Sequence, residues 1–241
     1  MTDHRRSLLE PSLPAMGLIV LRVDETIEQE FRDLIPPDRA RLHVTRVQSG
    51  DALTPETIAN MEAQLTEAAA LLPAAADFDV VAYACTSGTA FLTAERVAAL
   101  VRAGVPTRAV TNPLTASVAH CHHLGLRRIG LVSPYVASVA DTVAKAFEAN
   151  GIAVVENLCF GESDEATVAR IDPHYTANAA RRLANHADID GIFLSCTNLK
   201  TIAILDALSQ ELGIPVLSSN HSLAWHMEQL ALGTRKFQAF G

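Results

Sequence analysis

The sequence contains one short pattern twice, and this repeat is the strongest constraint on its fold. Residues 79–91 read DVVAYACTSGTAF, and residues 190–202 read DGIFLSCTNLKTI. In both, an Asp leads into a mostly apolar run that ends at a Cys followed by a Thr. The two cysteines, Cys85 and Cys196, are 111 residues apart. A glycine in an earlier apolar segment and a Gly-x-Pro triplet recur at nearly the same interval, so the sequence predicts two similar lobes related by an internal pseudo-twofold axis.

Strand-like apolar runs alternate with helix-like segments through both halves of the chain. The runs are apolar at almost every position, which is typical of parallel strands buried on both faces. We therefore expect an α/β fold in which each lobe has a four-stranded parallel sheet flanked by helices. One lobe is expected at 15–115 and the other at 116–232, and the last helix, 220–232, is compatible with packing on the first lobe.

The expected elements can be given as ranges. The strands are 16–23, 41–47, 79–85, 105–110, 127–133, 152–158, 190–196 and 214–219. The helices are 25–34, 54–72, 88–103, 136–149, 173–186, 199–212 and the last helix. Ligands of parallel sheets bind beyond the carboxyl ends of the strands, so both cysteines are expected in one active site between the lobes.

Composition and charge exclude several classes of function. Hydrophobic residues make up 49% of the 241 residues, enough for a substantial core. The formal net charge is −8 and there is no Lys/Arg block, which argues against nucleic acid and anionic membranes as partners. No apolar run approaches the roughly 18 residues that span a bilayer. Residues 1–15 do not resemble a secretory signal, so we expect a cytoplasmic protein with reduced cysteines.

Two thiols that face each other across a cleft suit one chemistry well. A thiolate on one side removes a proton from a carbon next to a carboxylate, and a thiol on the other side returns a proton to the opposite face. A helix that starts just after each Cys would stabilise the thiolate through its amides and dipole. This proton transfer requires no cofactor. The same thiols could instead act by addition of one thiolate to an activated double bond, with the other protonating the neighbouring carbon.

Polar residues beside the cysteines are candidates for binding a substrate carboxylate. Thr86 and Ser87 follow the first Cys, and Thr197 and Asn198 follow the second. Their hydroxyl, amide and backbone groups could hold a carboxylate as it gains charge during proton removal. Tyr135, which follows a Pro at the end of another strand, could place its phenol beside the same carboxylate.

Each candidate also has a purely structural interpretation. A single Cys at a strand end is usually a small buried hydrophobic residue, but two at equivalent repeat positions favour a functional pair. Cys121 and Cys159 lack this context and are expected to be structural. In HCHH (120–123), only His120 and His123 share a helix face, so we expect no metal site there. His221 and His226 are expected to pack or cap a helix.

The motifs ACTSG (84–88), SCTNL (195–199) and SPY (133–135) resemble the Asp/Glu racemase superfamily, in the branch of maleate cis-trans isomerase and arylmalonate decarboxylase. The resemblance extends from Gly17 to about Leu232. It implies that Cys85 is the nucleophile or base and Cys196 the opposing acid. It also implies a homodimer or homotetramer, no cofactor, and a small-molecule carboxylate substrate bound by a group of polar residues: Thr86, Ser87, Tyr135, Thr197 and Asn198. Decarboxylases of this branch carry Gly in place of the first Cys, so Cys85 argues against decarboxylation.

Two acidic residues depart from the maleate isomerase pattern. Asp24 and Glu165 stand where those enzymes carry Asn. Two added carboxylates would repel a maleate dianion and favour a substrate that bears an amine. The loop DETIE (24–28) is similar to the ectoine-utilisation protein A group, whose proposed substrates are ectoine or its acetylated 2,4-diaminobutyrate products. Asp24 could instead be a helix N-cap, and the other acids of this loop a charged first helical turn.

Three functions remain open from the sequence. The first is a cofactor-independent racemase or isomerase of a small amino-acid-like carboxylate, with a role in ectoine degradation. The second is a maleate cis-trans isomerase with a covalent adduct on Cys85. The third is a non-catalytic subunit that holds a metabolite between the lobes.

Overall fold

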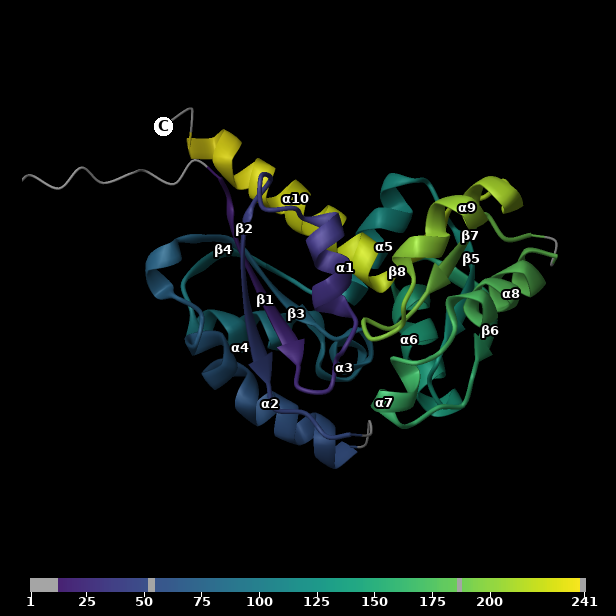
Figure 1. The fold of residues 1–241 in the computed structure, drawn as a ribbon, viewed down its shortest axis with the longest axis horizontal. Coiled ribbons are helices and arrows are strands. Elements are labelled where there is room, and N and C mark those ends of the chain that lie inside the picture. The colour runs from purple at the N-terminus through teal and green to yellow at the C-terminus, as the bar shows by residue number, and fades with distance from the viewer. Residues whose placement is uncertain (1–12, 52–54, 186–187, 239–241) are drawn as a thin grey trace, which may run out of the picture.

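A computed structural model describes residues 13–51, 55–185 and 188–238. Figure 1 shows two lobes side by side, each built on its own sheet. The sheet order is β2-β1-β3-β4 in the first lobe and β6-β5-β7-β8 in the second, and all strand pairs are parallel. The same order in both sheets is the arrangement that the sequence repeat predicts, and the expected α/β fold of two four-stranded lobes is confirmed.

The elements alternate along the chain. The strands are β1 (Ala15–Leu21), β2 (Arg41–Val47), β3 (Phe78–Ala84), β4 (Thr107–Thr111), β5 (Arg128–Ser133), β6 (Ala153–Cys159), β7 (Gly191–Leu194) and β8 (Val216–Ser218). The α-helices are α1 (Ile27–Leu34), α2 (Pro55–Ala70), α3 (Thr86–Leu92), α4 (Ala94–Gly104), α5 (Pro113–His123), α6 (Ala137–Ala149), α7 (Glu165–Val168), α8 (Pro173–Ala184), α9 (Ile202–Leu212) and α10 (Ser219–Gln238).

The inner strands explain why the apolar runs are unbroken. Every residue of β1 and β3 is buried, because helices cover both faces of the first sheet. One face packs against α2 and α4, and the other against α1 and α10. Helix α10 lies across the first lobe although it follows the last strand of the second (Figure 1). Its apolar residues pack with those of β1 and β3, among them Leu223, Met227, Met16 and Val80. The lobe boundary near residue 115 stays a prediction.

The predicted single helix at 88–103 is wrong. Thr93 has a φ of 74° and separates α3 from α4. Its hydroxyl accepts a hydrogen bond from the amide of Arg96, so it caps the second helix while its backbone ends the first. A positive φ in a β-branched residue is strained, and residue-type preference alone does not predict it. Among the described residues, no helix is long and apolar enough to cross a membrane.

A glycine sets how closely α4 approaches α2. A Cβ built on Gly104 would lie 2.3 Å from the carbonyl oxygen of Thr66. A backbone atom cannot move aside as a side-chain tip can, so the substitution Gly104→Ala must separate the helices. We expect the free energy of unfolding of the Gly104→Ala variant to be about 1–3 kcal/mol lower than that of the wild type, as in other overpacked cores. Urea unfolding followed by circular dichroism measures this change.

Gly233→Ala is the matched control for this prediction. Gly233 lies in α10 with no atom within 4 Å of its built Cβ. Because Ala favours helix over Gly, this variant should be at least as stable as the wild type. Equal stability of the Gly104→Ala variant and the wild type would show that the two helices are not held at a fixed distance.

Candidate active site

Cys85 and Cys196 lie at the carboxyl ends of equivalent strands. Cys85 directly follows β3, and Cys196 follows β7 after one residue. Both side chains are buried, with 4% and 6% of their surface exposed. The two thiols interact electrostatically, because charge on Cys85 raises the pKa of Cys196. The structure therefore brings the two predicted catalytic residues together, one from each lobe.

Cys85 is the N-cap of α3. Its Sγ accepts a hydrogen bond from the amide of Gly88 at 3.2 Å, and Ser87 Oγ lies 3.8 Å away. A Cβ at position 88 would lie 2.9 Å from this sulfur and 2.8 Å from the hydroxyl of Tyr83, so only glycine fits. Burial raises the pKa of the Cys85 thiol to about 11; the Gly88 amide opposes this rise, and the Glu165 carboxylate adds to it. The thiol is therefore protonated near neutral pH.

Cys196 lies in different surroundings, and the expectation that a helix starts just after each Cys is wrong for it. Helix α9 begins only at Ile202, so this thiol does not cap a helix as Cys85 does. Its φ is 129°, a conformation rare for any residue except glycine. Its amide donates to Ser219 Oγ at 3.0 Å, which helps to hold this backbone in place. Burial raises the pKa of Cys196 well above its ordinary value, and the carboxylates of Glu165 and Asp24 raise it further.

Asp24 is both a cap and a candidate ligand. Its Oδ1 accepts hydrogen bonds from the amides of Thr26 and Ile27 at 2.8 and 2.9 Å, at the start of α1. Its Oδ2 is buried and has no hydrogen-bond partner among the described residues. Burial raises the pKa of Asp24, and its amide hydrogen bonds oppose that rise. One oxygen thus caps α1, and the Thr197 side chain beside this carboxyl also opposes the rise in its pKa.

Asn198 joins the two lobes at the site and also binds Glu165 of its own lobe. Asn198 Nδ2 donates to Glu165 Oε2 at 3.0 Å and to its carbonyl oxygen at 2.9 Å. Asn198 Oδ1 accepts the amide hydrogen of Glu25, and its carbonyl oxygen accepts the hydroxyl of Thr26. Burial raises the pKa of Glu165, with a smaller contribution from Asp24. The side chain of Asn198 thus binds protein groups on both of its polar atoms.

The remaining predicted residues surround the same thiols. Thr86 Oγ1 lies 2.9 Å from Ser219 Oγ, and Thr197 Oγ1 donates to the carbonyl oxygen of Ala84 at 3.4 Å. Ser219 therefore bridges Thr86 and the amide of Cys196. The sequence reasoning missed Ser219, although a Ser directly after β8, the strand next to β7, is a signal that could have found it.

Tyr135 lies in the same buried cluster. Its side chain is 6% exposed, and its hydroxyl accepts a hydrogen bond from Ser195 Oγ at 3.4 Å. Burial raises the pKa of Tyr135, and charge on Cys196 and Cys85 raises it further. The phenol is therefore a hydrogen-bond donor beside both thiols.

A second residue missed from the sequence, Glu30, clamps the lobes. Its Oε1 accepts hydrogen bonds from the amides of Thr201 and Ile202 at 2.7 and 3.0 Å, where α9 begins. Its Oε2 accepts from Asn220 Nδ2 at 2.7 Å, and the same amide group donates to the carbonyl oxygen of Thr197. Glu30 is buried on the apolar face of α1, and an acid on such a face is the signal that could have found it.

Two cavities meet at Glu165. One of about 260 Å³ is lined by Arg22, Glu25 and Glu165 among others, and a smaller one of about 20 Å³ by Tyr135 and Glu165 among others. Neither is lined by Cys85 or Cys196. Glu165 therefore lines both cavities, and its charge also raises the pKa values of both thiols.

The histidines of α5 and α10 pack around Trp225. His120 stacks on this ring at 4.3 Å and His123 lies at 5.2 Å. His226 Nδ1 is 2.8 Å from the hydroxyl of Thr111, as its packing role predicts. Within the described part of the chain, no three His, Cys, Asp or Glu side chains are placed to hold a metal ion.

Comparison with known proteins identifies the family. The arylmalonate decarboxylase model (Amdase) matches residues 34–241. The chain belongs to this family. It is 29% identical to the arylmalonate decarboxylase of Bordetella bronchiseptica, with 94% of each chain covered, and 28% identical to the maleate isomerase of Nocardia farcinica, with 85% of this chain and 84% of that one covered.

The fold comparison agrees with the family assignment. The solved N. farcinica maleate cis-trans isomerase, a mutant with a covalently bound succinylcysteine intermediate, matches with a TM-score of 0.81 over 91% of this chain and 93% of that chain, at 24% identity. The expected branch of the Asp/Glu racemase superfamily is confirmed, and so is the expectation of an isomerase-type enzyme.

The raised thiol pKa predicts a specific pattern of alkylation. Labelling of Cys85 and Cys196 by iodoacetamide should be slow near pH 7 and should increase as the pH rises towards 11, because only the thiolate reacts. Glu165→Gln removes a charge that raises both pKa values, so it should speed labelling of both thiols severalfold at pH 8. Mass spectrometry of the labelled peptides measures each rate. Glu148→Gln, on the exposed face of α6, is the control, and equal acceleration by both substitutions would contradict the assigned role of Glu165.

The Glu30 clamp predicts a large loss of stability. Glu30→Ala leaves two backbone amides and one side-chain amide without their partner, so the free energy of unfolding should fall by about 2–4 kcal/mol. Glu28→Ala on the same helix removes only a partly exposed ion pair with Arg46 and should cost less than about 1 kcal/mol. Glu30→Gln keeps one acceptor oxygen, so its loss in free energy of unfolding should lie between those of the other two variants. Chemical unfolding of the three variants tests this order.

Proposed function

We propose that this protein is a cofactor-independent racemase or isomerase that moves the α-proton of a small amino-acid-like carboxylate between Cys85 and Cys196. The observation that carries the proposal is the pair of buried thiols, one from each lobe, that share the electrostatic influence of Glu165. The duplicated strand ends supply one sulfur for each face of a substrate held between the lobes.

The reaction balances without any further reagent. The thiolate of one Cys takes the proton from the α-carbon, and the C–H electron pair moves into the substrate carboxylate to give an enediolate. The thiol of the other Cys then protonates the opposite face of the carbon, and the electron pair returns to the new C–H bond. The two sulfurs finish with their protonation states exchanged. Tyr135, Thr86 and Thr197 are the proposed donors to the charged carboxylate.

The electrostatics of the site favour a substrate with a positive charge. Both thiols have raised pKa values, partly because of nearby carboxylates. A cationic amine or amidine beside Asp24 Oδ2 and Glu165 would offset those negative charges and lower the thiol pKa on binding. The substrate would thus activate its own catalytic base. Ectoine is such a cyclic amidine carboxylate, and its acetylated diaminobutyrate products each keep one amine, so we propose these compounds and a role in ectoine degradation.

Proton exchange in deuterated buffer tests the proposal. The protein is mixed separately with ectoine, each acetylated 2,4-diaminobutyrate, aspartate, glutamate and maleate, and the α-proton is followed by NMR. We expect deuterium to enter the α-carbon of an amine-bearing compound, with no exchange by the Cys85→Ser and Cys196→Ser variants. Asp24→Asn should weaken that reaction by raising KM, because it removes the proposed counter-ion.

One observation favours a second candidate, a maleate-type cis-trans isomerase. The N. farcinica relative carries a succinylcysteine intermediate, which is a covalent adduct on a Cys. In this chain the equivalent step would be addition of Cys85 to maleate followed by protonation from Cys196. Fumarate in the NMR assay and an added mass on Cys85 would establish this candidate in place of the first. If the Cys85→Ser and Cys196→Ser variants both keep the function of the wild type, the protein would instead be a non-catalytic metabolite-binding subunit. A homodimer or homotetramer stays a prediction.

A further inference from the structure

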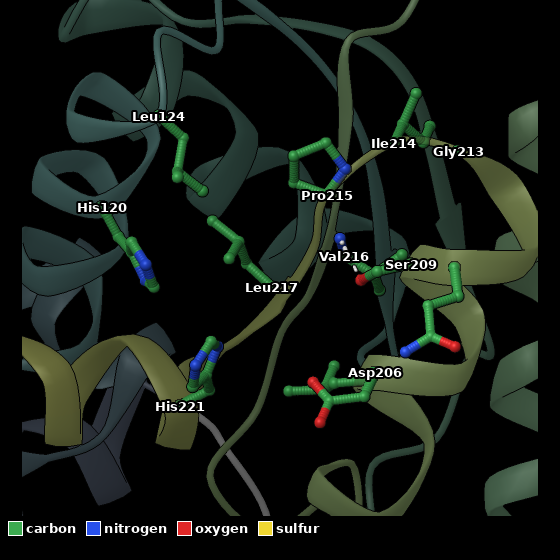
Figure 2. A pocket seen from close by; sticks show the side chains of 12 residues that line it. His120, Leu124, Asp206, Ser209, Gly213, Ile214, Pro215, Val216, Leu217 and His221 are labelled. Carbon is green, nitrogen blue, oxygen red and sulfur yellow. Dashed lines mark hydrogen bonds between the residues drawn. The ribbon is translucent and has the colours of Figure 1, made fainter.

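A cavity of about 590 Å³ lies away from the thiols, between α5, α9 and the junction of β8 with α10. Figure 2 shows its lining side chains turned towards a common space. Cys85, Cys196, Asp24 and Glu165 do not line it. Its volume is within the range of about 300–1,000 Å³ that is usual for small-molecule sites.

Two imidazoles form one wall of this cavity. The rings of His120 and His221 are 5.1 Å apart, and the His120 ring stacks on Trp225 at 4.3 Å. His120 Nδ1 lies at hydrogen-bond distance, 3.2 Å, from Ser222 Oγ. The bond to Ser222 therefore uses only one of the two ring nitrogens of His120. His221 Nδ1 is buried with no hydrogen-bond partner among the described residues. Burial lowers the pKa of His120 to about 4 and also lowers that of His221, so both rings are neutral near pH 7.

The rest of the lining carries a carboxylate and apolar side chains. Figure 2 shows Asp206 of α9 facing the same space as His221, and the Asp206 charge acts on the His221 ring. Leu124, Leu205 and Leu217 supply apolar surface, and Leu124 is 43% exposed. Among the residues that line the cavity, Asp206 is the only Asp, Glu, Lys or Arg. The one charged group of the lining is therefore the exposed Asp206 carboxylate, which lies beside neutral imidazole rings and apolar side chains.

We infer that this cavity is a second ligand site, which takes a small organic cation with an apolar body. The cationic N–H groups would bind Asp206 and donate to the unprotonated nitrogen of an imidazole, and the apolar body would lie on the three leucines. An anion would meet the Asp206 carboxylate with no Lys or Arg in the lining to offset it. A neutral ligand would leave the carboxylate without a counter-ion.

Tryptophan fluorescence gives a direct test, because Trp225 is the only Trp in the 241 residues and stacks on a lining ring. Benzamidine is the probe, and benzamide, which has the same shape without the charge, is the matched control. We expect a saturable change in Trp225 emission with benzamidine and affinity for benzamide at least about tenfold weaker. The Asp206→Asn substitution should weaken the binding of benzamidine to a similar extent, because it removes a charged hydrogen-bond partner.

Two further variants show whether benzamidine binds in this cavity or elsewhere on the protein. Asp33→Asn removes an exposed carboxylate outside the cavity and should leave benzamidine affinity unchanged. The double variant Cys85→Ser/Cys196→Ser should also bind benzamidine normally, so the test does not depend on the proposed reaction. Equal affinity for benzamide and benzamidine, an unchanged affinity in Asp206→Asn, or a signal lost in the double Cys variant would each overturn the inference. The absence of any saturable change with benzamidine would overturn it as well.

Discussion

The buried carboxylate of Glu30 is the contact on which the geometry of the active site depends. Two separate sheets have no shared strand, so only side-chain and loop contacts fix how their strand ends face each other. Glu30 reaches from α1 of the first lobe to the amides that start α9 and to Asn220. Through Asn220 the clamp extends to Thr197, the residue after the second thiol. A shift of this clamp would move Cys196 relative to Cys85.

The site that this clamp assembles contains an excess of negative charge. Two thiols lie near the buried carboxylates of Asp24 and Glu165, and burial raises the pKa of all four groups. Removal from water disfavours every charged form at once, so the thiols stay mostly protonated near neutral pH, and an added positive charge or a protonated carboxylate would lower their pKa values. In the proposed reaction, a cationic substrate would therefore activate its own base, and without it both thiols react slowly near neutral pH.

The sequence predicts the fold well and the contacts between lobes poorly. Continuous apolar runs such as 78–84 can be recognised locally, because a strand buried on both faces has few other compositions. The repeat then places Cys85 and Cys196 without any structure. Glu30 and Ser219 act across the interface, 171 and 133 residues from the groups that they bind, and no local pattern encodes such distant partners. The break at Thr93 was missed for a related reason, since tertiary packing supports a strained backbone that residue preference disfavours.

Duplication has not kept the two cysteines equivalent. Cys85 has an extended backbone, and its Sγ accepts a hydrogen bond from the amide of Gly88, the third residue of α3, so a helix dipole and a hydrogen bond both favour its thiolate. Cys196 has a φ of 129° and no helix directly after it, and two carboxylates raise its pKa. The same sequence pattern thus gives a more acidic sulfur in one lobe and a less acidic one in the other. This difference agrees with the proposal that Cys85 is the base or nucleophile and Cys196 the acid.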